Sequence, residues 1–421
     1  MPTETGNASL GGSQIEEAKM GRKRYDVIVV GARCAGSPTA MLLARQGYRV
    51  LLVDKARFPS DTLSSHFMQQ QGVSFIKRWG LLDRLVALGA PPVRSTSLNF
   101  GPFVIRGSAL PIDGVVEAYA TRRTLLDHML VDGAVESGAE VREGFTVEGL
   151  TFENGSVSGV RGRLNDRETT ESAAIVVGAD GRRSMVARDV GAPTYEAVPP
   201  QAVTYYSYWS DVPTDGLEIY VRPDRSWGMF PTNEGLTCIA LSWPVSEFQA
   251  NRHDVEGNFL KTLDLVPEVA ERVRNGARVE RFRGTGDVPN FFRKPYGDGW
   301  ALVGDAGYHK DPCTAQGIGD GFRDAQLLVD AIHAGLSGRR PMYQALGGYE
   351  KARNEHVMPI YQFTCELAAL QPPPPDKAAL LAAVARDPET SDRFVSLIAG
   401  SLSFSEFFAP ENIEQTMGLA G

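Results

Sequence analysis

The sequence has few cysteines, no excess of positive charge and no long apolar run. Its four cysteines, Cys34, Cys238, Cys313 and Cys365, are too scattered for a paired zinc site or for the disulfide framework of a small secreted domain, and no metal site is expected. Asp and Glu total 51 against 43 Lys and Arg, which argues against a nucleic-acid binder that neutralises phosphates. Charges interrupt every apolar run within about ten residues, so no membrane span is expected.

The length and the N-terminal segment indicate the domain organisation. At 421 residues the chain exceeds one ordinary hydrophobic core, which predicts two closely packed domains or lobes. Residues 1–24 are polar and lack the apolar stretch of a signal peptide, so we expect a disordered leader. The scattered cysteines are typical of a cytoplasmic protein. The sequence carries no indication of oligomeric state.

A βαβ unit is expected at the start of the first domain. The text YDVIVVGARCAGSPTAMLLARQGYRVLLVDK, which begins at Tyr25, predicts strands over 26–30 and 49–53. A helix over 35–46 connects them and ends at Gly47.

The glycines and the acid of this unit have the spacing of a dinucleotide site. Gly31 and Gly36 allow the backbone to turn and approach a pyrophosphate, and Asp54 follows where an acid binds ribose hydroxyls. Arg33 occupies the position of the middle glycine and would add a cation near the phosphates. An ordinary βαβ turn is the alternative, but the combination of strand, helix, strand and acid favours dinucleotide binding.

Three later segments also place unusual residues ahead of a helix. Arg122 and Arg123 begin a helix against the preference of its dipole, which indicates either solvated side chains or a bound anion. An apolar strand over 175–177 runs into Gly-Ala-Asp-Gly at 178–181. The segment GDAGYHKDPCTAQGIGDGFRDAQLLVDAI, residues 304–332, spends several glycines before an apolar-periodic helix, which suits a tight turn or a closely approaching ligand.

The ordered set of these motifs resembles a known family. It runs Gly-x-x-x-x-Gly with a following acid, Arg-x-x-Leu-Asp, Gly-Ala-Asp-Gly-x-x-Ser-x-x-x-Arg, and Gly-Asp-Ala followed by Pro. Over residues 25–335 the chain resembles the FAD-dependent group A flavoprotein monooxygenases, which have the para-hydroxybenzoate hydroxylase-like fold. Arg33 and Ala315 stand where that family usually has glycines.

The resemblance implies an α/β fold. A Rossmann-like FAD-binding domain with a three-layer ββα arrangement would be interleaved with an antiparallel-sheet substrate domain and followed by C-terminal helices. The FAD-binding domain would comprise 25–100, 115–195 and 284–335. The substrate domain would comprise 101–114 and 196–283, and a C-terminal helical region would comprise 336–421.

The resemblance also implies a set of cofactor contacts. The pyrophosphate, ribose, ribityl and flavin N1–C2=O contacts would come from Gly31, Ala32, Arg33, Ala35, Gly36, Asp54, Lys55, Ser65, Arg123, Asp180, Gly181, Gly304, Asp305, Gly317, Ile318 and Gly319. The Asp180-Gly181 stretch with Arg188 would support both the FAD pyrophosphate and a passing NAD(P)H.

Two catalytic candidates are expected at the flavin. Pro312 would lie beside the reacting edge of the isoalloxazine. His66 lies in a loop, SDTLSSHFMQQQG, whose position after Asp54 resembles the family's flavin-side loop; a structural role for this histidine is equally favoured. His309 is a weaker candidate for a substrate base.

Aromatic and β-branched residues alternate between the third and fourth motifs, which predicts an antiparallel sheet. In the resembling family this sheet roofs the substrate, so the substrate candidates are Tyr206, Tyr208, Tyr220, Arg222 and Trp227; for any one of them a plain core role is the alternative. Alternation places Tyr206 and Tyr208 on one face, with Tyr205 and Trp209 on the other.

The end of the chain is expected to be helical, with a kink at Pro359 and a stiff break at the four prolines of QPPPPDK. We expect the aromatic tail beyond that break to pack on the substrate half.

The resemblance implies a single-component FAD-dependent monooxygenase. It would hydroxylate an aromatic or polyketide-like small molecule with NAD(P)H and O2, through a flavin C4a-hydroperoxide, and nothing distinguishes NADH from NADPH. The alternative is an ene reductase of the geranylgeranyl reductase type, because Trp227 shortly precedes Phe230-Pro231. A halogenase is less favoured because W-x-W-x-I-P is missing, and a non-enzymatic FAD-binding protein is the remaining alternative.

Overall fold

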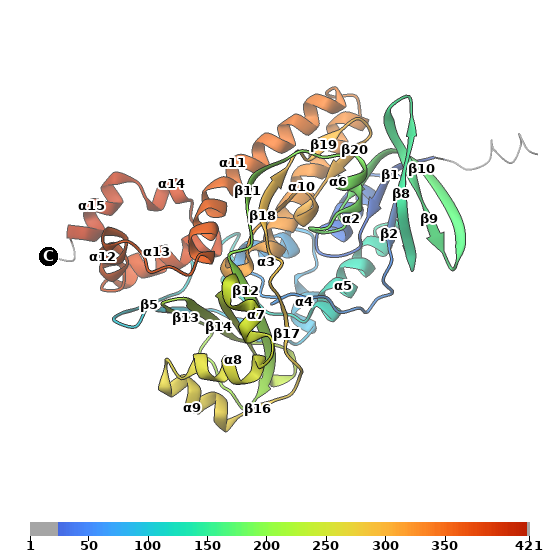
Figure 1. Ribbon diagram of the computed structural model, residues 1–421. Helices are drawn as coiled ribbons and strands as arrows, with labels where there is room; N and C mark the ends of the chain where they lie inside the picture. Colours follow the sequence, from blue (N-terminus) through green and yellow to red (C-terminus); the bar gives the residue numbers. More distant parts are fainter. Residues whose placement is uncertain (1–23, 419–421) are drawn as a thin grey trace, which may run out of the picture.

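The computed structural model describes residues 24–418, so all of the expected leader except Arg24 lies outside the described residues. A first sheet has the strand order β19-β20-β10-β1-β2-β7, with β20, β10, β1, β2 and β7 parallel (Figure 1). Its strands are β1 (Tyr25–Val30), β2 (Val50–Asp54), β7 (Glu140–Glu143), β10 (Arg167–Gly178), β19 (Tyr296–Gly297) and β20 (Trp300–Leu302).

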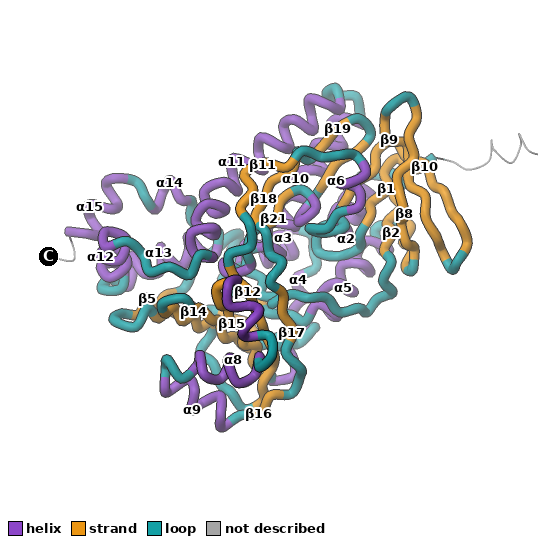
Figure 2. The backbone as a smooth tube through the Cα atoms, viewed as in Figure 1, coloured by secondary structure: helices purple, strands orange, loops and turns teal. Residues whose placement is uncertain are grey.

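Both faces of this sheet are covered. Helices α2 (Gly36–Arg45), α5 (Arg123–Glu136) and α10 (Gly317–Leu336) cover one face, and the antiparallel strands β8 (Phe145–Glu153) and β9 (Ser156–Leu164) continue from β10 over the other (Figure 2). Alternate residues of β1 enter two separate cores, Val27 and Val29 on the helical side and Ile28 and Val30 on the hairpin side. The predicted α/β fold class is confirmed.

A second, mixed sheet has the order β16-β12-β15-β14-β13-β4-β5, and β17 also pairs with β12. Its strands are β4 (Thr96–Asn99), β5 (Val104–Gly107), β12 (Ala202–Ser210), β13 (Leu217–Arg222), β14 (Arg225–Pro231), β15 (Thr237–Pro244), β16 (Ala277–Arg278) and β17 (Arg283–Thr285). Helices α8 (Val255–Leu263) and α9 (Pro267–Asn275) cover one of its faces.

The sheet pairing moves one expected boundary. The sequence-based division kept residues up to 100 in the first domain, but β4 pairs in parallel with β13, Thr96 opposite Leu217. Local sequence could not show this, because the partner strand lies more than 100 residues away.

Smaller elements connect the two sheets. They are the short sheets β11 (Thr194–Val198), β18 (Asn290–Arg293) and β21 (Tyr308–His309), and β3 (Pro92–Val93) with β6 (Ala118–Tyr119), together with helices α3 (Gln70–Arg78), α4 (Leu82–Ala87), α6 (Met185–Asp189) and α7 (Phe248–Asn251).

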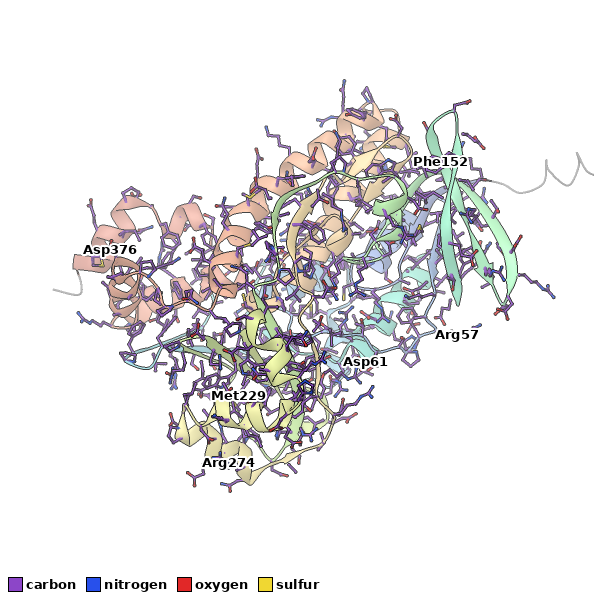
Figure 3. All side chains as sticks on the ribbon, in the orientation of Figure 1. Arg57, Asp61, Phe152, Met229, Arg274 and Asp376 are labelled. Atoms are coloured by element: carbon purple, nitrogen blue, oxygen red, sulfur yellow. The ribbon has the colours of Figure 1, made fainter. Side chains whose placement is uncertain are left out.

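Helix α11 (Met342–Ala368), which continues through Pro359, packs on α10. Helices α12 (Pro375–Val384) and α13 (Pro388–Ala399) pack on β5 at the edge of the second sheet, as predicted for the tail, and α14 (Phe404–Phe407) and α15 (Pro410–Gly418) pack on them. Phe394 and Leu397 of α13 share a core with Leu98 and Ile105 of the edge strands. Figure 3 marks the three regions by Phe152 on the hairpin, Met229 in the second sheet and Asp376 in the C-terminal helices.

Among residues 24–418, no helix has both the length and the apolar character that crossing a membrane requires.

The α13 core is testable by truncation of one side chain. Phe394 is 4% exposed, so Phe394→Ala should lower the free energy of unfolding by about 3–5 kcal/mol, measured by urea unfolding. Phe152 is 53% exposed, and Phe152→Ala is the matched control, with an expected change below about 0.5 kcal/mol. Equal losses in the two variants would show that the C-terminal helices are not part of the cooperative core.

Candidate active site

A cavity of about 780 Å³ lies between the two sheets and draws its lining from both. The carboxyl ends of parallel strands meet at its floor, where Gly31 follows β1, Ala179 follows β10 and Gly304 follows β20. Open α/β sheets bind their ligands at this edge. Motifs that lie far apart in the sequence, from Gly31 to Gly317, therefore meet at one cavity.

Two glycines of the first motif are required by backbone contact. A Cβ on Gly31, whose φ is +106°, would lie 2.4 Å from the carbonyl oxygen of Ala179, and a Cβ on Gly36 would lie 1.7 Å from that of Gly31. Gly31 and Ala35 line the cavity, whereas Gly36 and Ala32 are buried outside its lining, and the Ala32 N–H is bound to Asp54. These glycines are thus explained by the fold itself as well as by a ligand.

Gly317 has no such structural reason to be glycine. A Cβ on it would meet nothing within 4 Å, and the residue lines the cavity at the first turn of the 20-residue helix α10. The first N–H of this turn to bond a carbonyl is that of Asp320, to Gln316, so the preceding N–H groups stay available to a ligand. Ile318 also lines the cavity, while Gly319 faces the backbone of Gly72 on α3.

Asp54 is held in a fixed orientation beside the cavity. One carboxylate oxygen accepts the Ala32 N–H at 2.7 Å, and the other accepts the Ala56 N–H at 2.8 Å. Asp54 and the exposed Lys55 both line the cavity. The acid therefore both closes the β1–α2 turn and presents its edge to a ligand.

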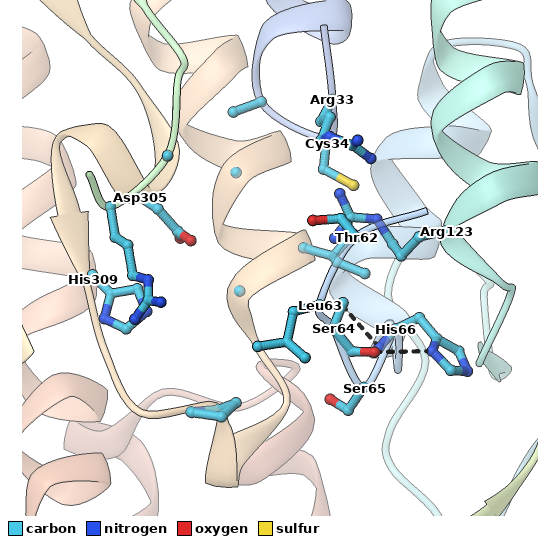
Figure 4. A pocket seen from close by; sticks show the side chains of 18 of the residues that line it. Arg33, Cys34, Thr62, Leu63, Ser64, Ser65, His66, Arg123, Asp305 and His309 are labelled. Carbon is cyan, nitrogen blue, oxygen red and sulfur yellow. Dashed lines mark hydrogen bonds between the residues drawn. The ribbon is translucent and has the colours of Figure 1, made fainter. Parts of the chain in front are cut away.

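Asp127 is a residue that the sequence reading missed. It is completely buried, and its carboxylate binds Arg33 Nη1 at 2.6 Å and Arg123 Nε at 3.0 Å, and accepts from Cys34 Sγ at 3.3 Å. Arg33, Cys34 and Arg123 line the cavity on the same side (Figure 4). A buried aspartate thus fixes two cations at the wall, and the Leu-Asp of the Arg-x-x-Leu-Asp motif was the available indication.

Asp180 caps α6. Its carboxylate accepts from the Ser184 hydroxyl at 2.5 Å and from the Met185 N–H at 2.6 Å, and it lines the cavity together with Gly181. Arg188, expected nearby, points away instead and pairs with Asp189. Arg182 and Arg183 line the cavity in its place. Helical spacing explains the difference, because Arg188 lies at the far end of α6.

Asp305, His309 and Pro312 lie along the wall opposite the loop that carries Ser65 and His66; Figure 4 shows Asp305 and His309 facing that loop across the cavity. His309 Nδ1 lies 2.5 Å from the carbonyl oxygen of Pro289, to which it donates. Ala315, one of the two positions where the sequence departs from the expected glycines, adopts a φ of +52°, a left-handed conformation that glycine adopts more readily.

His66 forms part of a buried network. Its Nδ1 lies 3.2 Å from the Ser64 carbonyl oxygen, to which it donates, and the Tyr208 hydroxyl lies 3.4 Å from the same nitrogen. Its Nε2 lies 3.3 Å from Thr232 Oγ1, whose hydroxyl donates to the Ala120 carbonyl. Burial lowers the pKa of His66 to about 3, so the ring is neutral near pH 7.

Strand alternation decides which aromatic residues face the cavity. Tyr206 lines it and Tyr208 packs on the same face, while Trp209 enters the core under α8 and α9 with Tyr205 packed against it, as predicted.

Of the other three substrate candidates, Trp227 lines the cavity, whereas Tyr220 and Arg222 do not. Trp227 and Tyr220 stack on each other, ring centroids 5.0 Å apart, at the α8–α9 core. Arg222 bonds Asn99 at the sheet edge. The sequence could not separate the three, because the parity of β13 and β14 relative to β12 depends on register.

The same strand register identifies three cavity-lining residues that the sequence analysis did not predict, Ala240, Gly228 and Ile219. Tyr206 is opposite Ala240, Ala240 is opposite Gly228, and Gly228 is opposite Ile219, and all four line the cavity. Small residues on the two middle strands leave a hollow between Tyr206 and Ile219.

Comparison with known proteins gives the cofactor. Residues 24–364 match the family described as FAD binding domain. The chain belongs to this FAD-binding family. Digeranylgeranylglycerophospholipid reductase 2 of Methanothermobacter thermautotrophicus is 31% identical over 335 residues, which cover 78% of this chain and 82% of that protein.

Solved structures share the fold. The myxobacterial chondrochloren halogenase CndH superposes with a TM-score of 0.76 at 23% identity, covering 94% of this chain and 98% of that one. The probable FAD-dependent monooxygenase pqsL of Pseudomonas aeruginosa gives a TM-score of 0.69 at 21% identity, with coverages of 89% and 99%. The chain is accordingly an FAD-dependent oxidoreductase by family, and its reaction is not decided by these likenesses.

The cavity residues fit FAD. Gly317 leaves open space where a side chain would stand, the free N–H groups of α10 face an anionic or carbonyl edge, and Arg33 and Arg123 supply cations. Asp54 lies at the end of β2, one strand from Gly31.

Filling the open space at Gly317 tests this fit. Gly317→Val should weaken FAD binding by about 1–3 kcal/mol, roughly 5-fold to 150-fold, because the new side chain enters the cavity. FAD titration of the apoprotein measures the effect. Gly348→Val, at an exposed α11 glycine with equally open space, is the matched control. Equal FAD affinity in both variants would remove Gly317 from the cofactor site.

Neutral burial of His66 predicts a pH dependence of stability. Because its folded pKa is about 3 and the unfolded value about 6.5, the unfolded chain binds the extra proton between these values. The contribution is complete above about pH 6.5 and falls by up to about 1.4 kcal/mol per pH unit as pH drops toward 3. His66→Gln should flatten this slope in urea unfolding, compared with His128→Gln on α5. Identical slopes for wild type and His66→Gln would contradict the buried neutral state.

Proposed function

We propose that this protein is an FAD-dependent monooxygenase that hydroxylates a small aromatic or polyketide-like molecule, using NAD(P)H and O2. The observation that carries the proposal is one cavity of about 780 Å³, which is lined both by residues of the FAD motifs and by the hollow of the second sheet. A volume in this range suits drug-sized ligands, and FAD would occupy part of it beside the hollow of the second sheet.

The hollow favours an aromatic ring. Tyr206 of β12 borders it on one side and Ile219 of β13 on the other, with Ala240 and Gly228 leaving space between them, and Phe230 lines the cavity two residues along β14 from Gly228. Thr204 and Ser242 add a polar pair whose hydroxyl oxygens are 2.7 Å apart. An apolar hollow with a few placed polar groups is typical of a small-molecule site.

Bound FAD would supply hydride acceptance from NAD(P)H and reaction with O2. The chain's own residues would provide orientation and electrostatics. The positive end of α10 at Gly317 would stabilise negative charge on the flavin, and the Arg33–Asp127–Arg123 cluster would hold the pyrophosphate region.

The remaining walls would exclude water and admit the reductant. Tyr206 and Phe230 are each only 4% exposed, so the second sheet shields the hollow from solvent. Arg182 and Arg183, linked through Asp287, are cations at the wall that suit the phosphates of a passing NAD(P)H. His66 is too acidic a conjugate acid to carry protons near pH 7 and instead holds Tyr208 and Thr232 in place.

An ene reductase of the geranylgeranyl type is the second candidate. The 31% identical relative is named as a digeranylgeranylglycerophospholipid reductase, which favours it. The cavity volume argues against the reductase, because one cavity would have to contain both the flavin and a lipid with two geranylgeranyl chains.

Isotope labelling separates the two reactions. Purified protein with FAD should oxidise NAD(P)H faster with an aromatic substrate found by screening, and under ¹⁸O₂ the product should gain one ¹⁸O atom per turnover. Mass spectrometry measures the label. A product that gains two hydrogens without oxygen, formed equally well without O2, would establish the reductase instead.

A further inference from the structure

The C-terminal helix α13 contributes one residue to the cavity, although the family match ends at residue 364 and does not include this helix. Ile398, in the last turn of α13, lines the cavity and is 6% exposed. No other described residue beyond 364 lines it. Neither the FAD motifs nor the second sheet accounts for an isoleucine at this wall.

One side of α13 is fixed to the edge of the second sheet. Just after β5, the Ser108 N–H donates to Asp392 Oδ1 at 2.7 Å, and the Leu110 N–H donates to Ser396 Oγ at 2.8 Å. Apolar residues of α13 and β5 share a core beside these bonds. The helix therefore keeps a defined position relative to the sheet.

The last turn of α13 is tied to the start of α10. Nε2 of Gln316, the residue directly before Gly317, donates to the carbonyl oxygen of Ile398 at 2.7 Å. The last carbonyl groups of a helix have no partner within the helix, and here a side chain from the loop ahead of α10 supplies one. Gln316 is only 6% exposed, so water competes little for this bond. Ile398 is thus held between α10 and the sheet.

The neighbours of Ile398 place it on the β13 side of the hollow. Ile219 of β13 borders the hollow and packs against the core that contains Ile398. Both isoleucines line the cavity, and Tyr206 of β12 borders the opposite side of the hollow. Beyond β13, α13 is therefore the next wall that a bound molecule would meet.

We propose that Ile398 is a specificity-determining residue, whose side chain closes the β13 side of the hollow and limits the length of the substrate. This limit rests on the proposed function, because it takes the hollow as the substrate site. It narrows the substrate to an aromatic molecule with at most a short, uncharged substituent at that end. Ile219 and Ile398 offer no side-chain hydrogen bond, and burying a charge against them would be costly.

A series of 4-alkylphenols, from methyl to octyl, tests the limit. FAD-loaded protein is titrated with each phenol, and binding is followed by the change in flavin absorption. Each methylene that enters the hollow should tighten binding by about fourfold. Once the chain reaches Ile398, affinity should fall, because a packed wall does not accept further carbons. Ile398→Ala should move the tightest-binding phenol to a chain longer by about two carbons, because truncation leaves a cavity.

Two further variants separate the wall from the stability of α13. Leu397→Ala truncates the neighbouring residue, which is 1% exposed in the same core but does not line the cavity. It should destabilise the protein as Ile398→Ala does and keep the wild-type optimum. Ile398→Val removes a single carbon at little cost to folding and should weaken the penalty on the first phenol beyond the optimum. The rate of FAD release should match wild type in all three variants.

Four results would overturn the proposal. The first is a chain-length profile that is unchanged in both Ile398 variants or shifted equally in Leu397→Ala. The second is an affinity that still rises at octyl in wild type, and the third is the absence of binding by every phenol. The fourth is faster FAD release from Ile398→Val with an unchanged profile, which would place Ile398 against the cofactor. Binding is read without turnover, so these outcomes are distinct from the oxygen-labelling result that tests the reaction.

Discussion

The close backbone packing where β1, β10 and β20 end is the constraint on which the site depends. Gly31 lies against Ala179, Gly36 against Gly31, and Gly304 is so near Ala35 that a Cβ would lie 2.8 Å from its methyl group. Only residues without side chains allow the three strand ends to meet this closely. Their meeting brings Asp54, the Asp127 cluster and the start of α10 to one cavity, which a second sheet then roofs.

The fold class could be predicted from the sequence because its motifs are local. Strand, glycine turn and helix follow within a few residues, so Gly31, Asp54, Arg123 and Asp305, which line one cavity, could be singled out without knowing any long-range pairing. Alternation within one strand likewise placed Tyr206 correctly. Asp127 was not predicted because it acts by binding two arginines, and one of them, Arg33, lies 94 residues away in the sequence.

The substrate wall was harder to predict because it depends on register between strands. Tyr220 looks like a pocket residue by composition, yet the pairing of β13 and β14 turns it toward α8 and α9, while Trp227 contacts both that core and the cavity. The hollow is formed instead by Gly228 and Ala240, which are unremarkable in sequence. The membership of β4 in this sheet, paired through Thr96 with Leu217, also depends on a contact that no local pattern contains.

Several polar side chains around the cavity are already paired within the protein, so the walls that they form are held in place. Asp127 holds two arginines, His66 holds Tyr208 and Thr232, and Asp180 caps α6. Gly317 is different, since it leaves open space where a side chain would stand. Rigid walls with an open position are what orientation of a bound cofactor and substrate requires.

Both candidate reactions, monooxygenase and reductase, depend on FAD as the cofactor. The most direct measurement is the absorption spectrum of the purified protein, followed by denaturation and chromatography of the released chromophore. We expect a flavin spectrum and the release of FAD in an amount equimolar to the chain. A colourless protein that takes up no FAD on titration would contradict FAD as the cofactor.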